Sequence, residues 1–289
     1  MVDLELYRIF KIVAKEENIT KASMQLNISQ PAVTKHIQNL EDILEVKLFE
    51  RKNKGLALTQ VGREIFEEIQ NPITVLENIY KKYSGNKDIE LGTHATMLSK
   101  VISKYLSKYY EINENVKINV TNNNTDEMLA KLENQELNIV ITKKVNNYEN
   151  PKIEFIKLGY LHDILVVNNN SELLNQPIDI DAIKEKVIYM PRKTSMTTLN
   201  FFESTKTNES EFKNIKNISY NTMIEIIKNT NGIGLMTKEY IEKELGEGEI
   251  VELKTNFLLN PVEFGIYINK ENKFKELNEL IKIIIDNRI

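Results

Sequence analysis

Residues 19–59 read ITKASMQLNISQPAVTKHIQNLEDILEVKLFERKNKGLALT, and this stretch determines how the rest of the chain is interpreted. Asn18 is placed to cap a first short helix, on which Ala22 and Leu26 lie four residues apart. Ser29 can cap a second helix, and Pro31 is tolerated in the first turn of that helix. An apolar stripe then recurs along the second helix at helical spacing, formed by Val33, Ile37, Leu40 and Leu44.

The opposite face of the second helix carries hydrogen-bonding groups, which are Gln30, Thr34, Lys35, Gln38 and Asn39. Such groups suit the edge of a DNA groove and contribute little to a core. Two short helices joined by a tight turn, the second with a polar outer face, predict a helix-turn-helix. In that motif the second helix lies in the major groove of DNA.

A basic hairpin is predicted after the second helix. Leu48 and Phe49 are its apolar anchors, and its tip lies at residues 52–55. Lys52 and Lys54 would then lie where a wing approaches phosphates. The alternative is a solvated turn, since most charged runs are exposed; beside a recognition helix we favour phosphate contact.

A family resemblance rests on residue types at fixed offsets between positions 10 and 62. They are Phe10, Val13, Ala14, Ala22, Ser29-Gln30-Pro31-Ala32, Leu40-Glu41, Leu48-Phe49-Glu50-Arg51, Leu58-Thr59 and Gly62. In this pattern the chain resembles LysR-type transcriptional regulators, and a gapless match of many residues is far more specific than any one triplet. The resemblance implies a winged helix-turn-helix domain over residues 1–58. The DNA-binding candidates are Ser29, Gln30, Pro31, Thr34, Lys35, His36, Gln38, Arg51, Lys52 and Lys54.

A long helix is predicted from a cap at Thr59 to about Tyr83, within a linker segment of residues 59–87. It carries a narrow apolar stripe made of Ile65, Ile69, Ile73, Leu76, Tyr80 and Tyr83. The resemblance implies that this helix forms the dimer contact, and packing of the stripe onto its own domain is the alternative. Pro72 removes a hydrogen bond inside the helix, so we expect a kink around residues 68–72.

From residue 88 onward, short apolar strands alternate with helices, which predicts an α/β domain with parallel sheet covered on both sides. Residues 137–141 (LNIVI) and 231–236 (NGIGLM) resemble markers of the LysR-type effector domain, although Asn138 stands where that family usually has Asp. The resemblance implies a periplasmic-binding-protein-like (type II) fold of two α/β subdomains. We expect the first over residues 88–160 plus 265–289, the second over 161–264, and a ligand in the cleft between them.

Hydroxyl groups precede or begin several predicted helices of this effector-binding domain, and helix N-termini attract anionic groups. The resemblance places such loops around the effector cleft. The effector-binding candidates are Thr93, His94, Thr96, Thr142, Lys143, Thr194, Ser195, Thr197, Asn221 and Thr222. The alternative for each hydroxyl is a cap on its own helix. Between residues 64 and 289 the only arginines are Arg192 and Arg288, which favours a monocarboxylate or an amino acid over a multiply charged anion.

Composition excludes several classes of protein. The chain has no Cys and three scattered His, so neither a disulfide nor a recognisable metal motif is expected. No catalytic or nucleotide-binding motif is present, so we expect neither an enzyme nor a bound cofactor. A stand-alone ligand-binding protein is the rival interpretation. The N-terminus does not resemble a signal peptide and no apolar run could span a bilayer, so a cytoplasmic protein with no membrane partner is expected.

The net charge of −4 at first opposes DNA binding, but its distribution favours it. Residues 29–63 carry six basic and four acidic side chains, a local excess of +2. This small excess implies that geometry and dimerisation supply the affinity for double-stranded DNA. The expected assembly is a homodimer or a dimer of dimers on an interrupted dyad operator, and RNA polymerase is a further candidate partner.

Overall fold

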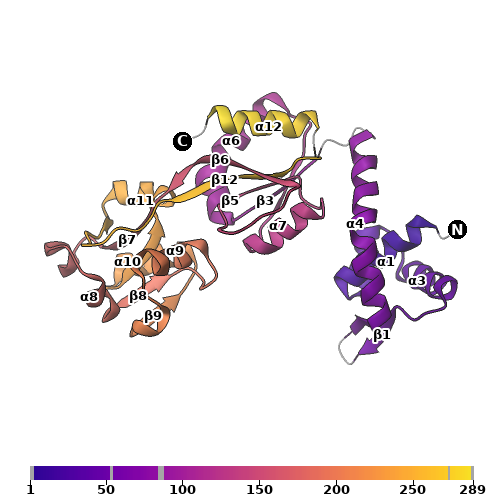
Figure 1. Ribbon diagram of the computed structural model, residues 1–289, viewed down its shortest axis with the longest axis horizontal. Helices are drawn as coiled ribbons and strands as arrows, with labels where there is room; N and C mark the ends of the chain where they lie inside the picture. Colours follow the sequence, from indigo (N-terminus) through magenta and orange to yellow (C-terminus); the bar gives the residue numbers. More distant parts are fainter. Residues whose placement is uncertain (1–2, 53–54, 84–87, 273, 288–289) are drawn as a thin grey trace. The chain divides into compact units, whose positions relative to one another are not determined.

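A computed structural model describes residues 3–52, 55–83, 88–272 and 274–287 of the chain. The chain divides into two compact units at residue 87, and each is described separately below (Figure 1). Within the described residues, no helix is both long and apolar enough to cross a membrane.

The first unit is a helix-turn-helix with a two-stranded wing. Its elements are α1 (Leu4–Glu16), α2 (Ile19–Leu26), α3 (Gln30–Leu44), β1 (Phe49–Lys52), β2 (Gly55–Leu58) and α4 (Gln60–Tyr83). Asn18 caps α2 by accepting a hydrogen bond of 3.0 Å from the N–H of Lys21. Ser29 caps α3 in the same way, with 3.3 Å to the N–H of Ala32. Both predicted caps are therefore confirmed.

One small core holds these helices together. Helix α1 packs against α2, α3 and α4. The fully buried side chains include Phe10, Val13, Ala22, Val33 and Leu40, as the spacing of apolar residues predicted. The polar face of α3 is left outside this core, which is how the unit presents it to solvent.

Helix α4 continues through Pro72 as one helix. The kink around residues 68–72 stays a prediction. The apolar stripe divides in two: Ile65 and Ile69 pack against the core of the first unit, whereas Leu76 and Tyr80 are 45% and 74% exposed. Packing onto its own domain thus accounts for the first half of the stripe and not for the second.

The second unit contains two five-stranded sheets. The first has the order β4-β3-β5-β12-β6. Its strands are β3 (Ile89–Thr93), β4 (Ile118–Thr121), β5 (Ile139–Lys143), β6 (Ile153–Leu161) and β12 (Val262–Asn269). The helices that belong with it are α5 (Ala95–Met97), a π-helical turn η1 (Leu98–Ile102), α6 (Ser103–Ile112), α7 (Thr125–Glu133) and α12 (Lys275–Asp286).

The second sheet has the order β11-β7-β10-β8-β9. Its strands are β7 (Asp163–Asn168), β8 (Val187–Met190), β9 (Asn214–Asn217), β10 (Ile233–Thr237) and β11 (Ile250–Glu252). Its helices are α8 (Ile180–Lys184), α9 (Met196–Thr205), α10 (Tyr220–Asn229) and α11 (Glu242–Glu247). Short 3-10 turns lie at Glu172–Asn175 (η2), Glu209–Glu211 (η3) and Lys238–Tyr240 (η4).

The expectation of parallel sheet is confirmed for only part of each sheet, because both sheets are mixed. Strand β3 is parallel to β4 and β5, but β12 is antiparallel to both β5 and β6. In the second sheet β10 is parallel to β8 and antiparallel to β7. The cause is the double crossing of the chain: β6 leads out of the first sheet, β12 leads back in, and the two lie side by side (Figure 1).

Strand bounds differ slightly from the expected subdomain borders. Strand β12 begins at Val262, so residues 262–264, which we had assigned to the second subdomain, lie in the first sheet. Below, "first subdomain" and "second subdomain" mean the parts of the second unit built on the first and second sheets.

Candidate DNA-binding surface and effector cleft

Helix α3 has one buried face and one solvent face. Val33 and Leu40 are fully buried, and Pro31 occupies the first turn, where a missing N–H breaks no helical hydrogen bond. The hydroxyl of Thr34 donates to the carbonyl oxygen of Gln30 at 3.0 Å, and its oxygen can still accept. Of the predicted DNA-binding residues here, Thr34 and His36 are half-buried, and the exposed ones are Ser29, Gln30, Pro31, Lys35 and Gln38.

The wing is tied to the end of α3 by Glu41, a residue that the sequence analysis did not single out for this role. Its buried carboxylate accepts hydrogen bonds from the backbone N–H groups of Leu48, at 2.8 Å, and Phe49, at 3.3 Å. The other carboxylate oxygen lies 2.6 Å from Nζ of Lys47. One side chain thereby fixes where the first wing strand leaves the helix.

Strands β1 and β2 form the wing, with Lys52 paired to Gly55. The predicted phosphate contacts Arg51 and Lys52 are the last two residues of β1. Their side chains, and the whole of Lys54, lie outside the described part of the chain, so their roles stay predictions.

In the first subdomain, four effector-binding candidates gather where two parallel strands end. The carboxyl ends of β3 and β5 are adjacent, with Thr93 paired to Ile141. Thr93 donates from its hydroxyl to the Ile141 carbonyl oxygen at 2.8 Å. Nε2 of His94 lies 3.1 Å from Oγ1 of Thr125, at the start of α7. Next to them on β5 are Thr142 and Lys143, both buried.

Two hydroxyl candidates of the first subdomain, Thr142 and Thr96, differ in burial. The buried hydroxyl of Thr142 has no hydrogen-bond partner within the described ranges. Thr96 is half-buried in the first turn after β3. Carboxyl ends of parallel strands are a common place for ligands in open α/β sheets, which agrees with a cleft at this edge.

In the second subdomain the candidates fall at the starts of α9 and α10. Ser195 caps α9 by accepting from the N–H of Thr198 at 3.1 Å, and its contact with an effector stays a prediction. Thr197 is buried in the first turn of the same helix, and Thr194 is exposed. Asn221 and Thr222 are exposed in the first turn of α10, where Thr222 bonds Ser219 at 2.8 Å between hydroxyls.

The two subdomains meet at Lys143. Its Nζ lies 2.7 Å from Oδ1 of Asp163, 2.8 Å from Oγ1 of Thr197 and 3.1 Å from Oγ1 of Thr237. The Asp163 carboxylate also accepts from the hydroxyl of Thr237, at 2.7 Å, and from the side-chain amide of Asn200, at 3.0 Å. The side chains of Lys143 and Asp163 are 6% and 0% exposed. Lys143 and Thr197, predicted separately, are therefore in direct contact.

Sequence reasoning missed Asp163, Asn200 and Thr237. The signal available for Asp163 was an acidic residue directly before the apolar run of residues 164–167. The other two gave no local signal, because their partners lie between 37 and 94 positions away in the chain.

Burial and charge at this junction shift two pKa values downward. Burial is the larger cause at His94, and the positive charge of Lys143 is the second, so the pKa of His94 falls below its ordinary value of 6.5. Burial likewise lowers the pKa of Lys143, and the charge and hydrogen bond of Asp163 act in the opposite direction. His94 is thus kept neutral near pH 7.

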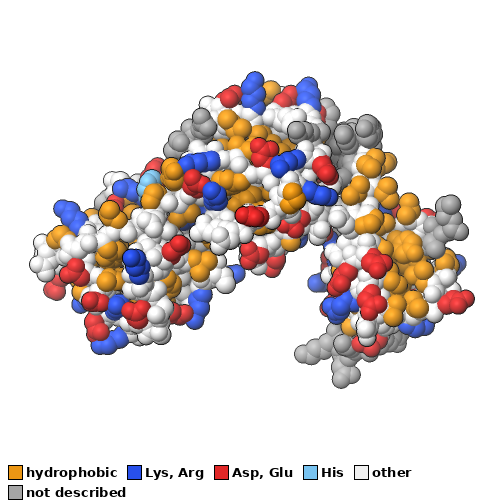
Figure 2. All heavy atoms as spheres, in the orientation of Figure 1, with side chains coloured by type: hydrophobic (Ala, Val, Ile, Leu, Met, Phe, Trp, Pro, Cys, Tyr) orange, Lys and Arg blue, Asp and Glu red, His pale blue; other side chains and the backbone are white. Residues whose placement is uncertain are grey.

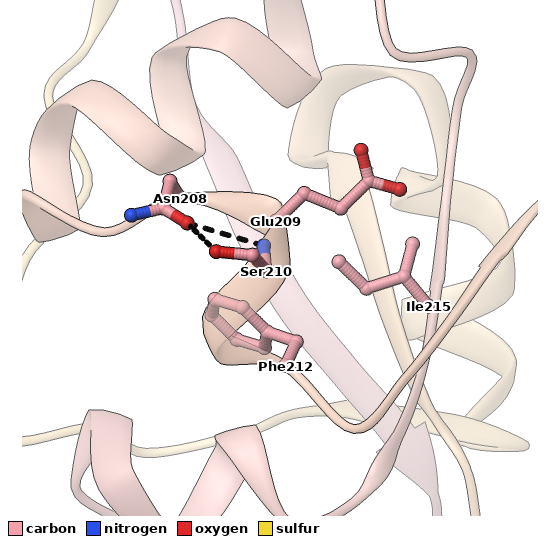
Figure 3. A pocket seen from close by; sticks show the side chains of 5 residues that line it. All are labelled: Asn208, Glu209, Ser210, Phe212 and Ile215. Carbon is pink, nitrogen blue, oxygen red and sulfur yellow. Dashed lines mark hydrogen bonds between the residues drawn. The ribbon is translucent and has the colours of Figure 1, made fainter.

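Several hollows lie on the second unit. A groove of about 480 Å³ runs beside the junction and is lined by residues of the β5–β6 loop, of α9 and of the start of β12 with the segment before it, among them Lys144, Met196, Asn200 and Glu263. A second hollow of about 570 Å³ lies at the 3-10 turn η3, between Phe212 and Ile215, where the side chain of Asn208 accepts hydrogen bonds from Ser210 (Figure 3). None of the predicted effector residues lines that second hollow.

Family models match both units of the chain. The model described as a bacterial regulatory helix-turn-helix protein of the lysR family matches residues 4–63. The model described as the LysR substrate binding domain matches residues 85–285, more than half of the chain. The chain belongs to the LysR family of transcriptional regulators.

Relatives among curated sequences agree with this assignment. The chain is 24% identical over 244 residues to the uncharacterized HTH-type transcriptional regulator YoaU of Bacillus subtilis, covering 82% of each chain. It is 43% identical over 65 residues to the RuBisCO operon transcriptional regulator of Allochromatium vinosum, covering 22% of each.

Solved structures of full-length LysR-type proteins have the same fold. A full-length OxyR variant of Pseudomonas aeruginosa superposes with a TM-score of 0.72 at 16% identity, covering 99% of this chain and 97% of that one. CbnR in complex with its target DNA superposes with a TM-score of 0.66 at 14% identity, covering 98% and 99%.

The predicted class is confirmed: this LysR-family protein is a transcriptional regulator and not an enzyme. It has a DNA-binding helix-turn-helix unit and an effector-binding domain, and regulators of this family bind DNA and small molecules and form oligomers.

Proposed function

We propose that this regulator reads its operator through the exposed face of α3. The observation that carries the proposal is the division of that helix, with Val33 and Leu40 buried while Gln30, Lys35 and Gln38 are exposed. Gln30, Thr34 and Lys35 contact base edges or flanking phosphates, and a good bidentate base contact contributes about 1–3 kcal/mol of discrimination. Lys35 acts as a point charge, since an ammonium lacks the planar fork of Arg.

The remaining contacts hold the backbone of the DNA. Ser29 and Pro31 bring the N-terminus of α3 to a phosphate, His36 and Gln38 line the groove, and the wing residues Arg51, Lys52 and Lys54 hold the neighbouring backbone. A dimer of dimers places paired helices in successive major grooves of an interrupted dyad. RNA polymerase is the partner through which DNA bending changes transcription.

The effector is a monocarboxylate or an amino acid bound between the subdomains. Thr93, His94, Thr96 and Thr142 line the cleft from the first subdomain, and Thr194, Ser195, Thr197, Asn221 and Thr222 line it from the second. Support comes from the adjacent carboxyl ends of β3 and β5 and from the scarcity of Arg in this domain. Lys143 takes part through its charge, because its three donors are already used inside the protein.

Binding to upstream DNA of the protein's own gene tests the operator proposal. Gln30→Ala and Lys35→Ala should each weaken binding in an electrophoretic mobility shift at fixed salt by about 5- to 150-fold, the equivalent of about 1–3 kcal/mol for one lost base contact. The exposed Lys282, on α12, provides the matched control, and Lys282→Ala should leave the shift unchanged. Equal binding by all four proteins would contradict the assignment of α3.

The effector proposal is tested by thermal shift with panels of monocarboxylates, amino acids and dicarboxylates. A ligand of the native state raises the melting temperature, and the stabilisation grows with the ratio of its free concentration to its Kd. The operator complex is then examined at saturating ligand. An effector should change the footprint or the bend angle, since only different affinities for two states can drive a response. A ligand that binds and changes neither is not an effector.

A further inference from the structure

At the junction between the subdomains, the hydrogen-bond donor and its acceptors come from different subdomains. The donor, Lys143, comes from the last position of β5 in the first subdomain. All three of its acceptors belong to the second: Asp163 begins β7, Thr197 lies in the first turn of α9, and Thr237 ends β10.

The acceptors match the chemistry of one group. A primary ammonium has three N–H donors and no acceptor, and here it meets one carboxylate and two hydroxyl oxygens at 2.7–3.1 Å. The side-chain amide of Asn200 orients the Asp163 carboxylate, because it donates to the other carboxylate oxygen at 3.0 Å. Asp163, Thr197 and Thr237 are called the ammonium socket below.

The socket is deeply buried, unlike the ion pair next to it. The Asp163 side chain is 0% exposed and the Lys143 side chain 6%, whereas the neighbouring Lys144 is 47% exposed in its pair with Glu263. A buried charge is tolerated when it is paired and fully hydrogen-bonded, and removing one partner leaves the other uncompensated. Loss of the cation would therefore leave the Asp163 carboxylate buried and unpaired at this contact between the subdomains.

We infer that the second subdomain carries a binding site for a primary ammonium group, and that Lys143 is its tethered occupant. Filled in this way, the socket joins the two subdomains in the absence of any small molecule. The site selects a primary ammonium by hydrogen bonding, so a quaternary ammonium of the same charge, which has no N–H, does not replace Lys143.

Chemical rescue of Lys143→Ala in the full-length protein tests this inference, and it needs neither the effector nor the operator. The substitution should lower the melting temperature, since it leaves the Asp163 carboxylate buried and unpaired. Ethylammonium chloride should then restore part of the loss, with a stabilisation that rises with the logarithm of its concentration once most of the socket is filled. Tetramethylammonium chloride at the same concentration should give no such shift.

Three proteins serve as controls in the same titration. The wild type should not respond to ethylammonium, because Lys143 fills the socket. Lys144→Ala should not respond either, since it removes a surface ammonium one residue away. Lys143→Ala combined with Asp163→Asn should lose the rescue. An equal response of the wild type, or no response of Lys143→Ala to ethylammonium, overturns the inference.

A second measurement applies if Lys143→Ala does not fold. Lys143→Met keeps most of the side-chain volume without the charge, and Asp163→Asn keeps the shape of its partner. Each alone should lower the melting temperature, and the double variant should be more stable than either, because no unpaired charge remains. Additive losses in the double variant would overturn the inference as well.

Discussion

His94 couples the pH of the medium to the stability of the effector-binding domain. Because burial and Lys143 hold its pKa below 6.5, the unfolded chain takes up this proton first as the pH falls. The native state should therefore lose stability from about pH 7 downward, until His94 itself is protonated. His94→Gln should flatten that part of a plot of melting temperature against pH. An unchanged slope in His94→Gln would contradict this account.

Glu41 determines the position of the wing through three charge-assisted hydrogen bonds. Glu41→Gln keeps the shape of the side chain but replaces one carboxylate oxygen, an acceptor, by an NH2 group, which is a donor. It should lower the free energy of unfolding by about 1–3 kcal/mol, measured by urea denaturation followed by circular dichroism. Asp42→Asn, at the exposed neighbour on the same helix, should change it little. If both variants behave alike, the carboxylate does not hold the wing.

Strand β12 requires a glycine at its irregularity. The pairing of β12 with β6 shifts register between Phe264 and Gly265, and a Cβ at position 265 would lie 2.2 Å from the carbonyl oxygen of Ile156. Gly265→Ala should therefore destabilise the domain by about 1–3 kcal/mol through overpacking, seen as a lower midpoint in urea. Gly246, whose Cβ would meet nothing within 4 Å, is the control. Loss of stability in Gly246→Ala alone would contradict this account.

Elements were predictable from sequence wherever their causes are local. The caps at Asn18 and Ser29 follow from residue types a few positions apart, and the structure has them as expected. The direction of β12 was not predictable in this way, because it pairs with β5 and β6 more than a hundred residues earlier. The junction residues Asp163 and Thr237 escaped notice for the same reason.

At the scale of the whole molecule, the exposed half of α4 is the surface expected to join two copies. Apolar side chains reach the surface along this helix, and Leu76, Ile79 and Tyr80 are 45%, 49% and 74% exposed (Figure 2). Replacing Leu76 and Tyr80 together by Ser should shift the protein from dimer or larger assemblies to monomer in light scattering. Replacing the exposed Tyr110 and Ile112, on α6, by Ser is the control, and it should leave the assembly state unchanged. A monomeric wild type would rule out the α4 contact.

The position of β12 between β5 and β6 also has a consequence for folding during synthesis of the chain. As the polypeptide leaves the ribosome, residues 88–161 supply every strand of the first sheet except the one that joins its two parts. Strands β5 and β6 cannot pair through that gap until residues 262–269 have been synthesised. The second sheet, whose strands are contiguous in the chain, is complete by then. Nascent chains that stop before residue 262 would consequently carry a finished second half and an open, protease-sensitive first half.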